Sequence, residues 1–76
     1  MPRYYFNLCS EEAEVTDLVG ESCDNDVAAL GTALQRAGEV VQKRLFRNES
    51  IEEGWIAVED EAQREVLRLP LRAAAY

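Results

Sequence analysis

Alternating hydrophobic and polar residues predict two strands near the start of the chain. In "RYYFNLC" (residues 3–9), Tyr4, Phe6 and Leu8 fall on one face of an extended strand, and the residues between them fall on the other. The stretch "EVTDLV" (14–19) is typical of a shorter second strand, which a glycine ends. The polar turn between the two stretches makes them a hairpin.

Two further strands are predicted near the end of the chain, in "WIAVED" (55–60) and "EVLRLPL" (65–71). In the third strand Ile56 and Val58 share one face, and in the fourth strand the three leucines share one face. Hydrophobic residues gather on these faces, so we expect both to pack against a helix.

The stretch between these pairs of strands predicts one long helix of about 24 residues. Asp24 and Asn25 are both good N-caps, and Asn48 is a residue at which a helix can end. Apolar residues recur at steps of three and four and predict a stripe that packs on the sheet, formed by Val27, Leu30, Leu34, Ala37, Val41 and Leu45.

The order strand, strand, helix, strand, strand predicts a two-layer α+β fold. We expect a four-stranded, mostly antiparallel sheet with the long helix on one face and the N-terminal strand in the centre. A chain of 76 residues has the length of a single domain, residues 1–76. Such a small domain buries only about 60% of its unfolded surface, and many gain stability by self-association.

One helix leaves the second face of the sheet uncovered. Strand alternation places on that face Tyr5, Trp55, Ala57, Val66 and Arg68. Because tyrosine and tryptophan are enriched in interfaces, we expect this face to bind a second copy of the chain or another protein. The alternative is a solvated sheet face with scattered apolar groups, which is common in antiparallel sheets.

The charge balance restricts the class of partner. Fifteen acidic residues against eight basic ones give a net charge of −7, which favours solubility and disfavours binding to nucleic acid. The basic residues of the helix, Arg36, Lys43, Arg44 and Arg47, are therefore expected to be solvated.

An alternative function is an acidic regulator or inhibitor that occupies a basic groove of a partner protein, either antitoxin-like or a nucleic-acid mimic. It requires acidic residues from separate parts of the chain to gather on one surface, namely Glu11, Glu12, Glu14, Glu52, Glu53, Glu59 and Asp60.

The residues needed for common catalytic sites are missing. The chain has no histidine and hence no Ser/His or Cys/His pair, and it has no glycine-rich phosphate loop. We expect Cys9 and Cys23 to be incidental free thiols. The sequence thus predicts a protein that is not an enzyme, with no catalytic residue, no cofactor and no small-molecule substrate.

An acidic turn, Glu59-Asp60-Glu61, joins the last two predicted strands. Clustered carboxylates can bind a divalent cation, but the spacing is not that of a calcium loop. We interpret it as a hairpin turn in which the Asp60 carboxylate accepts hydrogen bonds from its own backbone, and we expect no metal site.

The N-terminal segment predicts the location of the protein. "MPRYYFNL" has no long apolar stretch and does not resemble a signal peptide. No run approaches the ~18 apolar residues that would span a membrane. We expect a cytoplasmic protein without a membrane partner.

Several of these pieces together resemble a small bacterial family, the domain of unknown function 6894. They are "MPRYYFNL", Asp17 with Gly20, "GWIAVED" and "LRLPL". Members share an aromatic first strand, an Asp…Gly turn, an alanine-rich helix, a Gly-Trp strand and a Leu-Pro strand. Members often carry His and Asp-Gly after the first strand, where this chain has Cys9-Ser10-Glu11, and Asp-Gly in the last turn, where it has Ala62-Gln63. The resemblance implies this order of elements and no known activity.

Overall fold

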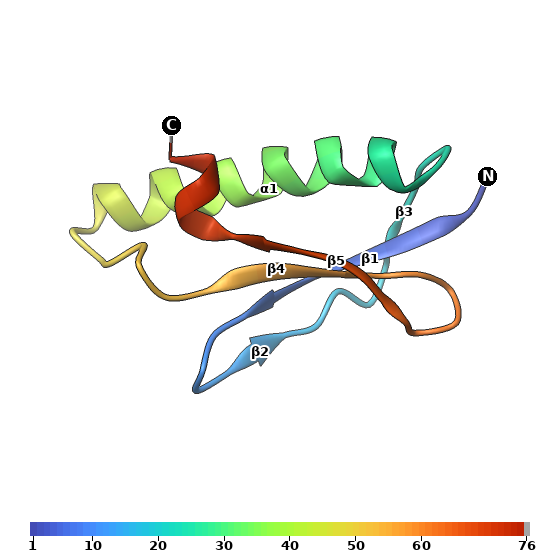
Figure 1. Cartoon of the computed structure of the whole chain (residues 1–76). Coiled ribbons are helices and arrows are strands. Elements are labelled where there is room, and N and C mark those ends of the chain that lie inside the picture. Colours follow the sequence, from blue (N-terminus) through green and yellow to red (C-terminus); the bar gives the residue numbers. More distant parts are fainter. Residues whose placement is uncertain (76) are drawn as a thin grey trace.

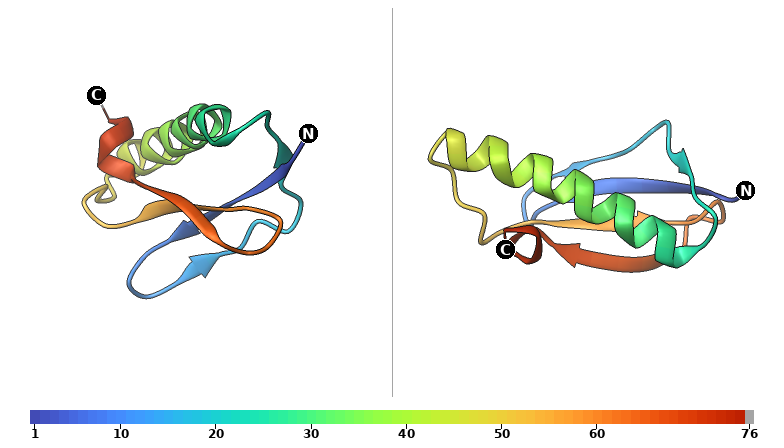
Figure 2. Two further views of the ribbon diagram at one scale, coloured as in Figure 1. Left: turned by 45° about the vertical axis from the view of Figure 1, so that its right-hand side comes forward. Right: turned by 90° about the horizontal axis from the view of Figure 1, so that it is seen from above.

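The computed structural model describes residues 1–75 of the chain. Its elements, in order, are β1 (Arg3–Cys9), β2 (Glu14–Val15), β3 (Glu21–Ser22), α1 (Asp26–Phe46), β4 (Trp55–Glu59), β5 (Glu65–Pro70) and the 3₁₀ helix η1 (Leu71–Ala74). The helix α1 lies across one face of an antiparallel sheet, which gives two layers (Figure 1; Figure 2). The α+β class is confirmed, although the sheet has five strands rather than the expected four.

The strand order is β2-β1-β4-β5, and β3 pairs with the other end of β1. The long N-terminal strand is therefore central, as the sequence predicts. All four strand pairs are antiparallel. The pairing of β1 with β4 runs from Tyr5 opposite Glu59 to Cys9 opposite Trp55. This register decides which side chains meet on each face of the sheet.

The predicted strand 14–19 is too long, because only Glu14–Val15 form a strand, and the fifth strand, β3, follows at Glu21–Ser22. The Asp17 side chain accepts a hydrogen bond of 3.1 Å from the backbone N–H of Phe6, which a continuous strand would have paired with a carbonyl. The chain then turns at Gly20, whose φ is +75°, before it pairs with β1 again. A Cβ at Gly20 would lie 2.8 Å from the carbonyl oxygen of Tyr4, so this turn requires glycine.

The hydrophobic core lies between α1 and the sheet. The predicted inner faces of the strands are confirmed, because the core contains Tyr4, Phe6, Ile56, Val58, Leu69 and Leu71, with Leu8 and Leu67 packed against it. Cys23 belongs to this core, whereas Cys9 is buried outside it, and both are free thiols.

The prediction of the helix stripe is wrong in part. The helix packs on the sheet mainly through Ala29, Ala33, Ala37 and Val41, and the three alanines have no exposed surface. Alanine side chains let the helix approach the sheet closely, so the bulkier residues of the predicted stripe flank the contact. Four of them are exposed, namely Val27, Leu30, Leu34 and Leu45.

Both ends of the helix follow the sequence signals. The Asn25 side chain caps the N-terminus by accepting a hydrogen bond of 2.9 Å from the N–H of Ala28. Asn48 follows the C-terminus with a φ of +58°, in the left-handed region that ends helices. After β5 the chain forms η1 up to Ala74, and Tyr76 lies outside the described residues.

Candidate functional site

The candidate site is the face of the sheet that points away from α1, which we call the open sheet face (Figure 1). Residues paired directly across antiparallel strands point to the same face, so the register fixes its members. Three rows cross it: Glu14, Cys9, Trp55 and Pro70; then Asn7, Ala57 and Arg68; then Tyr5, Glu59 and Glu65.

Of the five residues that the sequence places on this face, three keep accessible surface there: Tyr5, Trp55 and Arg68. Ala57 lies on the face, but its neighbours leave it only 5% exposed. Placing Val66 there is wrong, because a β-bulge in β5 disturbs the alternation and Val66 packs against the core cluster instead.

Trp55, Arg68 and Glu65 form one connected group on the open sheet face. The Arg68 guanidinium lies over the Trp55 ring, 4.9 Å from its centre, in cation–π geometry. Its Nε and Nη2 donate hydrogen bonds of 3.2 and 3.1 Å to the two carboxylate oxygens of Glu65. The hydrogen bonds and charge of Glu65 raise the pKa of Arg68, so the guanidinium over the ring stays charged.

The Cys9 thiol is in the wrong protonation state for a nucleophile. Burial raises its pKa, and so does the hydrogen bond of 3.4 Å that the thiol donates to the Glu14 carboxylate. The thiol is therefore protonated at neutral pH. Beside it, Asn7 is buried and uses its side-chain oxygen to accept a hydrogen bond of 2.8 Å from the N–H of Asp17. Both side chains serve the local structure.

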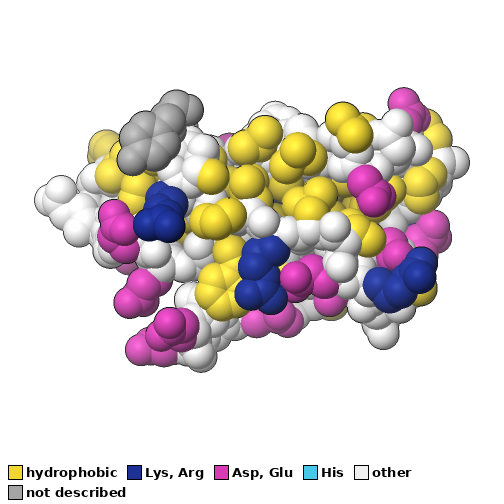
Figure 3. All heavy atoms as spheres, viewed as in Figure 1, with side chains coloured by type: hydrophobic (Ala, Val, Ile, Leu, Met, Phe, Trp, Pro, Cys, Tyr) yellow, Lys and Arg dark blue, Asp and Glu magenta, His cyan; other side chains and the backbone are white. Residues whose placement is uncertain are grey.

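Carboxylates surround the open sheet face. Glu11, Glu52 and Glu53 line a hollow of about 310 Å³ next to Trp55 and Arg68. Glu59 and Glu61 line a second hollow of about 270 Å³ beside Tyr5. We call these five residues and Glu14 together the acidic rim. Figure 3 shows several acidic side chains close together at the lower left of the molecule. Residues from two strands and three connecting segments thus converge on one surface.

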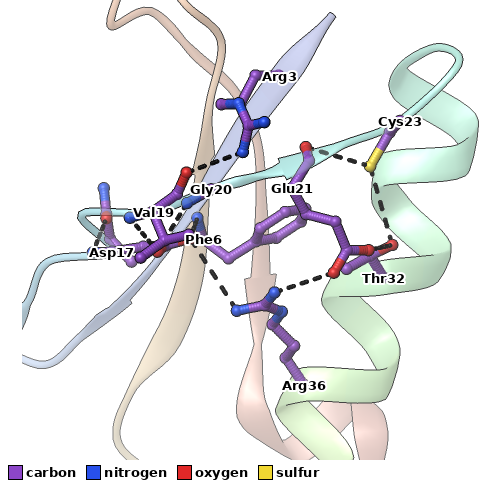
Figure 4. A network of polar contacts seen from close by, with 10 residues as sticks. Arg3, Phe6, Asp17, Val19, Gly20, Glu21, Cys23, Thr32 and Arg36 are labelled. Atoms are coloured by element: carbon purple, nitrogen blue, oxygen red, sulfur yellow. Dashed lines mark hydrogen bonds and ion pairs between the residues drawn. The ribbon is translucent and has the colours of Figure 1, made fainter. Parts of the chain in front are cut away.

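Asp17 is a structural residue that the sequence pattern alone did not single out. Its carboxylate accepts hydrogen bonds of 3.0 Å from the N–H groups of Val19 and Gly20, in addition to the bond from Phe6 (Figure 4). Desolvation acts to raise its pKa, but these three bonds and the nearby Arg36 outweigh it and lower the pKa. An Asp three residues before a glycine that ends a strand is the signal for such a turn.

Two basic residues of α1, Arg36 and Arg44, contact the rest of the fold, whereas Lys43 is exposed as expected. Arg36 donates a hydrogen bond of 3.1 Å to Glu21, and its guanidinium lies 5.0 Å from the centre of the Phe6 ring (Figure 4). Arg44 donates to the backbone carbonyl oxygens of Ser50 and Glu53. These two residues therefore join the helix to β3 and to the loop before β4.

The acidic turn after β4 is a hairpin turn, as the sequence predicts for Asp60. One oxygen of its carboxylate accepts hydrogen bonds from the N–H groups of Ala62 and Arg64, and the Arg64 side chain binds the other. The bond from the Arg64 backbone is the main cause of the lowered pKa of Asp60. Within residues 1–75, no group of three or more metal-binding side chains converges.

In the described part of the chain, every helix is too short or too polar to cross a lipid bilayer.

Comparison with known proteins confirms the family resemblance. A family model described as "Domain of unknown function (DUF6894)" matches residues 3–72, nearly the whole chain. No curated protein and no solved structure matches it.

Proposed function

The chain belongs to the DUF6894 family, to which no activity is assigned, and from its surfaces we propose that it is a non-enzymatic module that binds another protein through the open sheet face. Trp55 and Tyr5 are the anchors of the proposed interface. Both are partly exposed, and tryptophan and tyrosine are enriched among the residues that contribute most to binding energy.

The acidic rim is the observation that carries this proposal, and it assigns a chemistry to the partner. Glu11, Glu52 and Glu53 line the same hollow as Trp55, and the cationic side chain of Arg68 already lies over its ring. A lysine or arginine of a partner would meet carboxylates and an aromatic face together, which strengthens both contacts. We therefore propose a positively charged segment of another protein as the ligand of this face.

The same rim argues against self-association through the open sheet face. Two copies placed face to face would bring the carboxylates of one rim toward those of the other, and each copy carries a net charge of −7. Opposed like charges in an interface cost several kcal/mol. A second copy is therefore a poor ligand for this surface.

A second candidate function is inhibition of a protein whose basic groove normally binds nucleic acid. Its support is that Glu14 and Glu59 lie on the open sheet face and that Glu11, Glu52 and Glu53 line a hollow beside it, whereas Asp60 is turned toward its own hairpin. The two candidates differ in a measurable consequence. An inhibitor would displace nucleic acid from its partner, and a simple binding module would not.

The absence of histidine and the protonated Cys9 thiol support a role without catalysis. We further propose that the protein acts in the cytoplasm, where two free thiols are stable.

The proposal is tested by affinity capture from extracts of the host cytoplasm, with native protein and two variants as bait. Trp55→Ala removes the anchor, whereas Phe46→Ala removes an aromatic residue that is 92% exposed at the end of α1. Because truncation of an aromatic hot spot costs about 2 kcal/mol or more, we expect Trp55→Ala to reduce capture at least about tenfold. Phe46→Ala should capture normally.

The charge of the captured protein completes the test. A partner with a basic surface that elutes at raised salt is the expected result. Equal capture by Trp55→Ala and the native protein would refute the open sheet face as the interface.

A further inference from the structure

One side of α1, which flanks the contact between the helix and the sheet, has an unusual composition. In a chain of which 30% of residues are charged, this side carries no charge from Val27 to Leu45. We call it the uncharged helix face, and its members are Val27, Leu30, Gly31, Leu34, Gln35, Gly38, Gln42 and Leu45. They lie together because residues three, four and seven apart share one side of a helix. The charged residues of α1, such as Arg36, Glu39 and Lys43, lie on the other sides.

This face is apolar and accessible. Val27 and Leu45 are 77% and 56% exposed, and Leu30 and Leu34 are about 40% exposed. Figure 3 shows hydrophobic side chains (yellow) gathered along the front of α1, above β5, with few charged groups among them. These four residues stay exposed because Ala29, Ala33 and Ala37 make the contact with the sheet in their place. Contiguous apolar surface of this kind marks an interaction site in soluble proteins.

We propose that the uncharged helix face binds the same face of a second copy, with the two α1 helices antiparallel. Two molecules of charge −7 repel each other least where neither carries a charge, and this face meets that condition. The helix α1 lies on one face of the sheet, and the open sheet face is the other (Figure 2). The dimer is therefore independent of the proposed function and leaves both open sheet faces accessible.

The glycines make the face self-complementary. A Cβ added at Gly31 or Gly38 would meet nothing within 4 Å, so both positions are shallow notches on the helix surface. A two-fold axis near residue 36 sets Leu34 of one copy beside Gly38 of the other, and Val27 beside Leu45. Large side chains then fill notches in both directions, as symmetric interfaces require. Antiparallel helices also bring opposite ends of their dipoles together.

The size of the face limits the strength of the dimer. The 21 residues of α1 extend about 32 Å, and one side of one helix offers less than the ~800 Å² per partner of a standard stable interface. We therefore expect a weak dimer that forms only at high protein concentration.

The test is sedimentation equilibrium of the native protein and three variants over a concentration series. Leu34→Glu places a charge in the centre of the interface, and Gly38→Gln fills a notch with a residue that favours helix more than glycine does. Both are expected to weaken the dimer at least about tenfold. Gly38→Gln should also raise the melting temperature, which separates loss of the dimer from loss of folding. Trp55→Ala, on the open sheet face, should dimerise like the native protein.

The salt dependence gives a second readout. Raising the salt concentration from about 0.05 M to about 0.5 M should strengthen the dimer, because it screens the repulsion between two acidic molecules. A native protein that stays monomeric at millimolar concentration would overturn the proposal. A dimer that survives both α1 substitutions, or that Trp55→Ala abolishes, would do the same.

Discussion

Replacing Leu71 by alanine is expected to lower the free energy of unfolding by about 2–5 kcal/mol. Leu71 begins η1, has no exposed surface and is one of the two largest fully buried side chains. Its N–H donates a hydrogen bond of 3.1 Å to the carbonyl oxygen of Gly54, which fixes η1 next to the start of β4. A domain of 76 residues has a total stability of about 4–11 kcal/mol, so this loss would be a large fraction of it.

Urea denaturation of Leu71→Ala and Leu30→Ala checks this expectation. Leu30 undergoes the same chemical change on a partly exposed side of α1, so its substitution should cost less than about 1 kcal/mol. Both variants are compared at a concentration that keeps copies apart. Equal losses for the two would show that Leu71 is not part of the core.

Asp17→Ala is expected to lower the free energy of unfolding by about 2–3 kcal/mol, the second largest effect. The substitution removes the acceptor of three backbone N–H groups at once, those of Phe6, Val19 and Gly20. The Asp17 side chain is only 12% exposed, so water replaces these bonds poorly. Denaturation with urea measures the loss. Arg64→Ala is the control, because it removes a partner of another aspartate, Asp60, from a side chain that is 79% exposed.

The pH dependence identifies the carboxylate as the cause. The pKa of Asp17 in the folded protein lies below its ordinary value of 3.8, so the unfolded chain binds more protons at acidic pH. The stability that Asp17 provides is therefore present above about pH 4 and is lost as the pH falls through the folded pKa. Asp17→Asn cannot ionise, so the stability difference from the native protein should shrink on acidification. A difference that stays constant with pH would contradict this role.

The sequence predicts the strands well because a two-residue period survives in β1 and β4. Tyr4 and Phe6 in β1, and Ile56 and Val58 in β4, alternate with residues of the other face, and the structure confirms them. The alternation of β5 alone cannot reveal a bulge, because a bulge is a property of how β5 pairs with β4. For this reason Val66 was placed on the wrong face.

The helix stripe was harder to predict, because hydrophobicity favours leucine over alanine at a buried position. Here the close approach of α1 to the sheet favours the small side chain, so Ala33 is buried and Leu34 is exposed. The early end of the second strand, at Val15, also could not be predicted from hydrophobicity. The Asp17 carboxylate competes with a backbone carbonyl for the N–H of Phe6, and the alternation of "EVTDLV" does not contain that information.

The candidate site was predictable in its anchors but not in its rim. Tyr5 and Trp55 follow from strand alternation and residue type. The acidic rim depends on the register of β1 with β2 and β4, which places Glu14 and Trp55 on either side of Cys9. It also depends on loops whose course the sequence leaves open.

The central claim is that the open sheet face binds a basic segment, and amide and indole NMR spectra of the native protein test it most directly. The probe is a short arginine-rich peptide added at low salt. The claim predicts shifts at the Trp55 indole N–H, at Tyr5 and at the acidic rim, with the amides of α1 unchanged and the shifts lost at high salt. Shifts spread evenly over all acidic surfaces, or confined to α1, would contradict it.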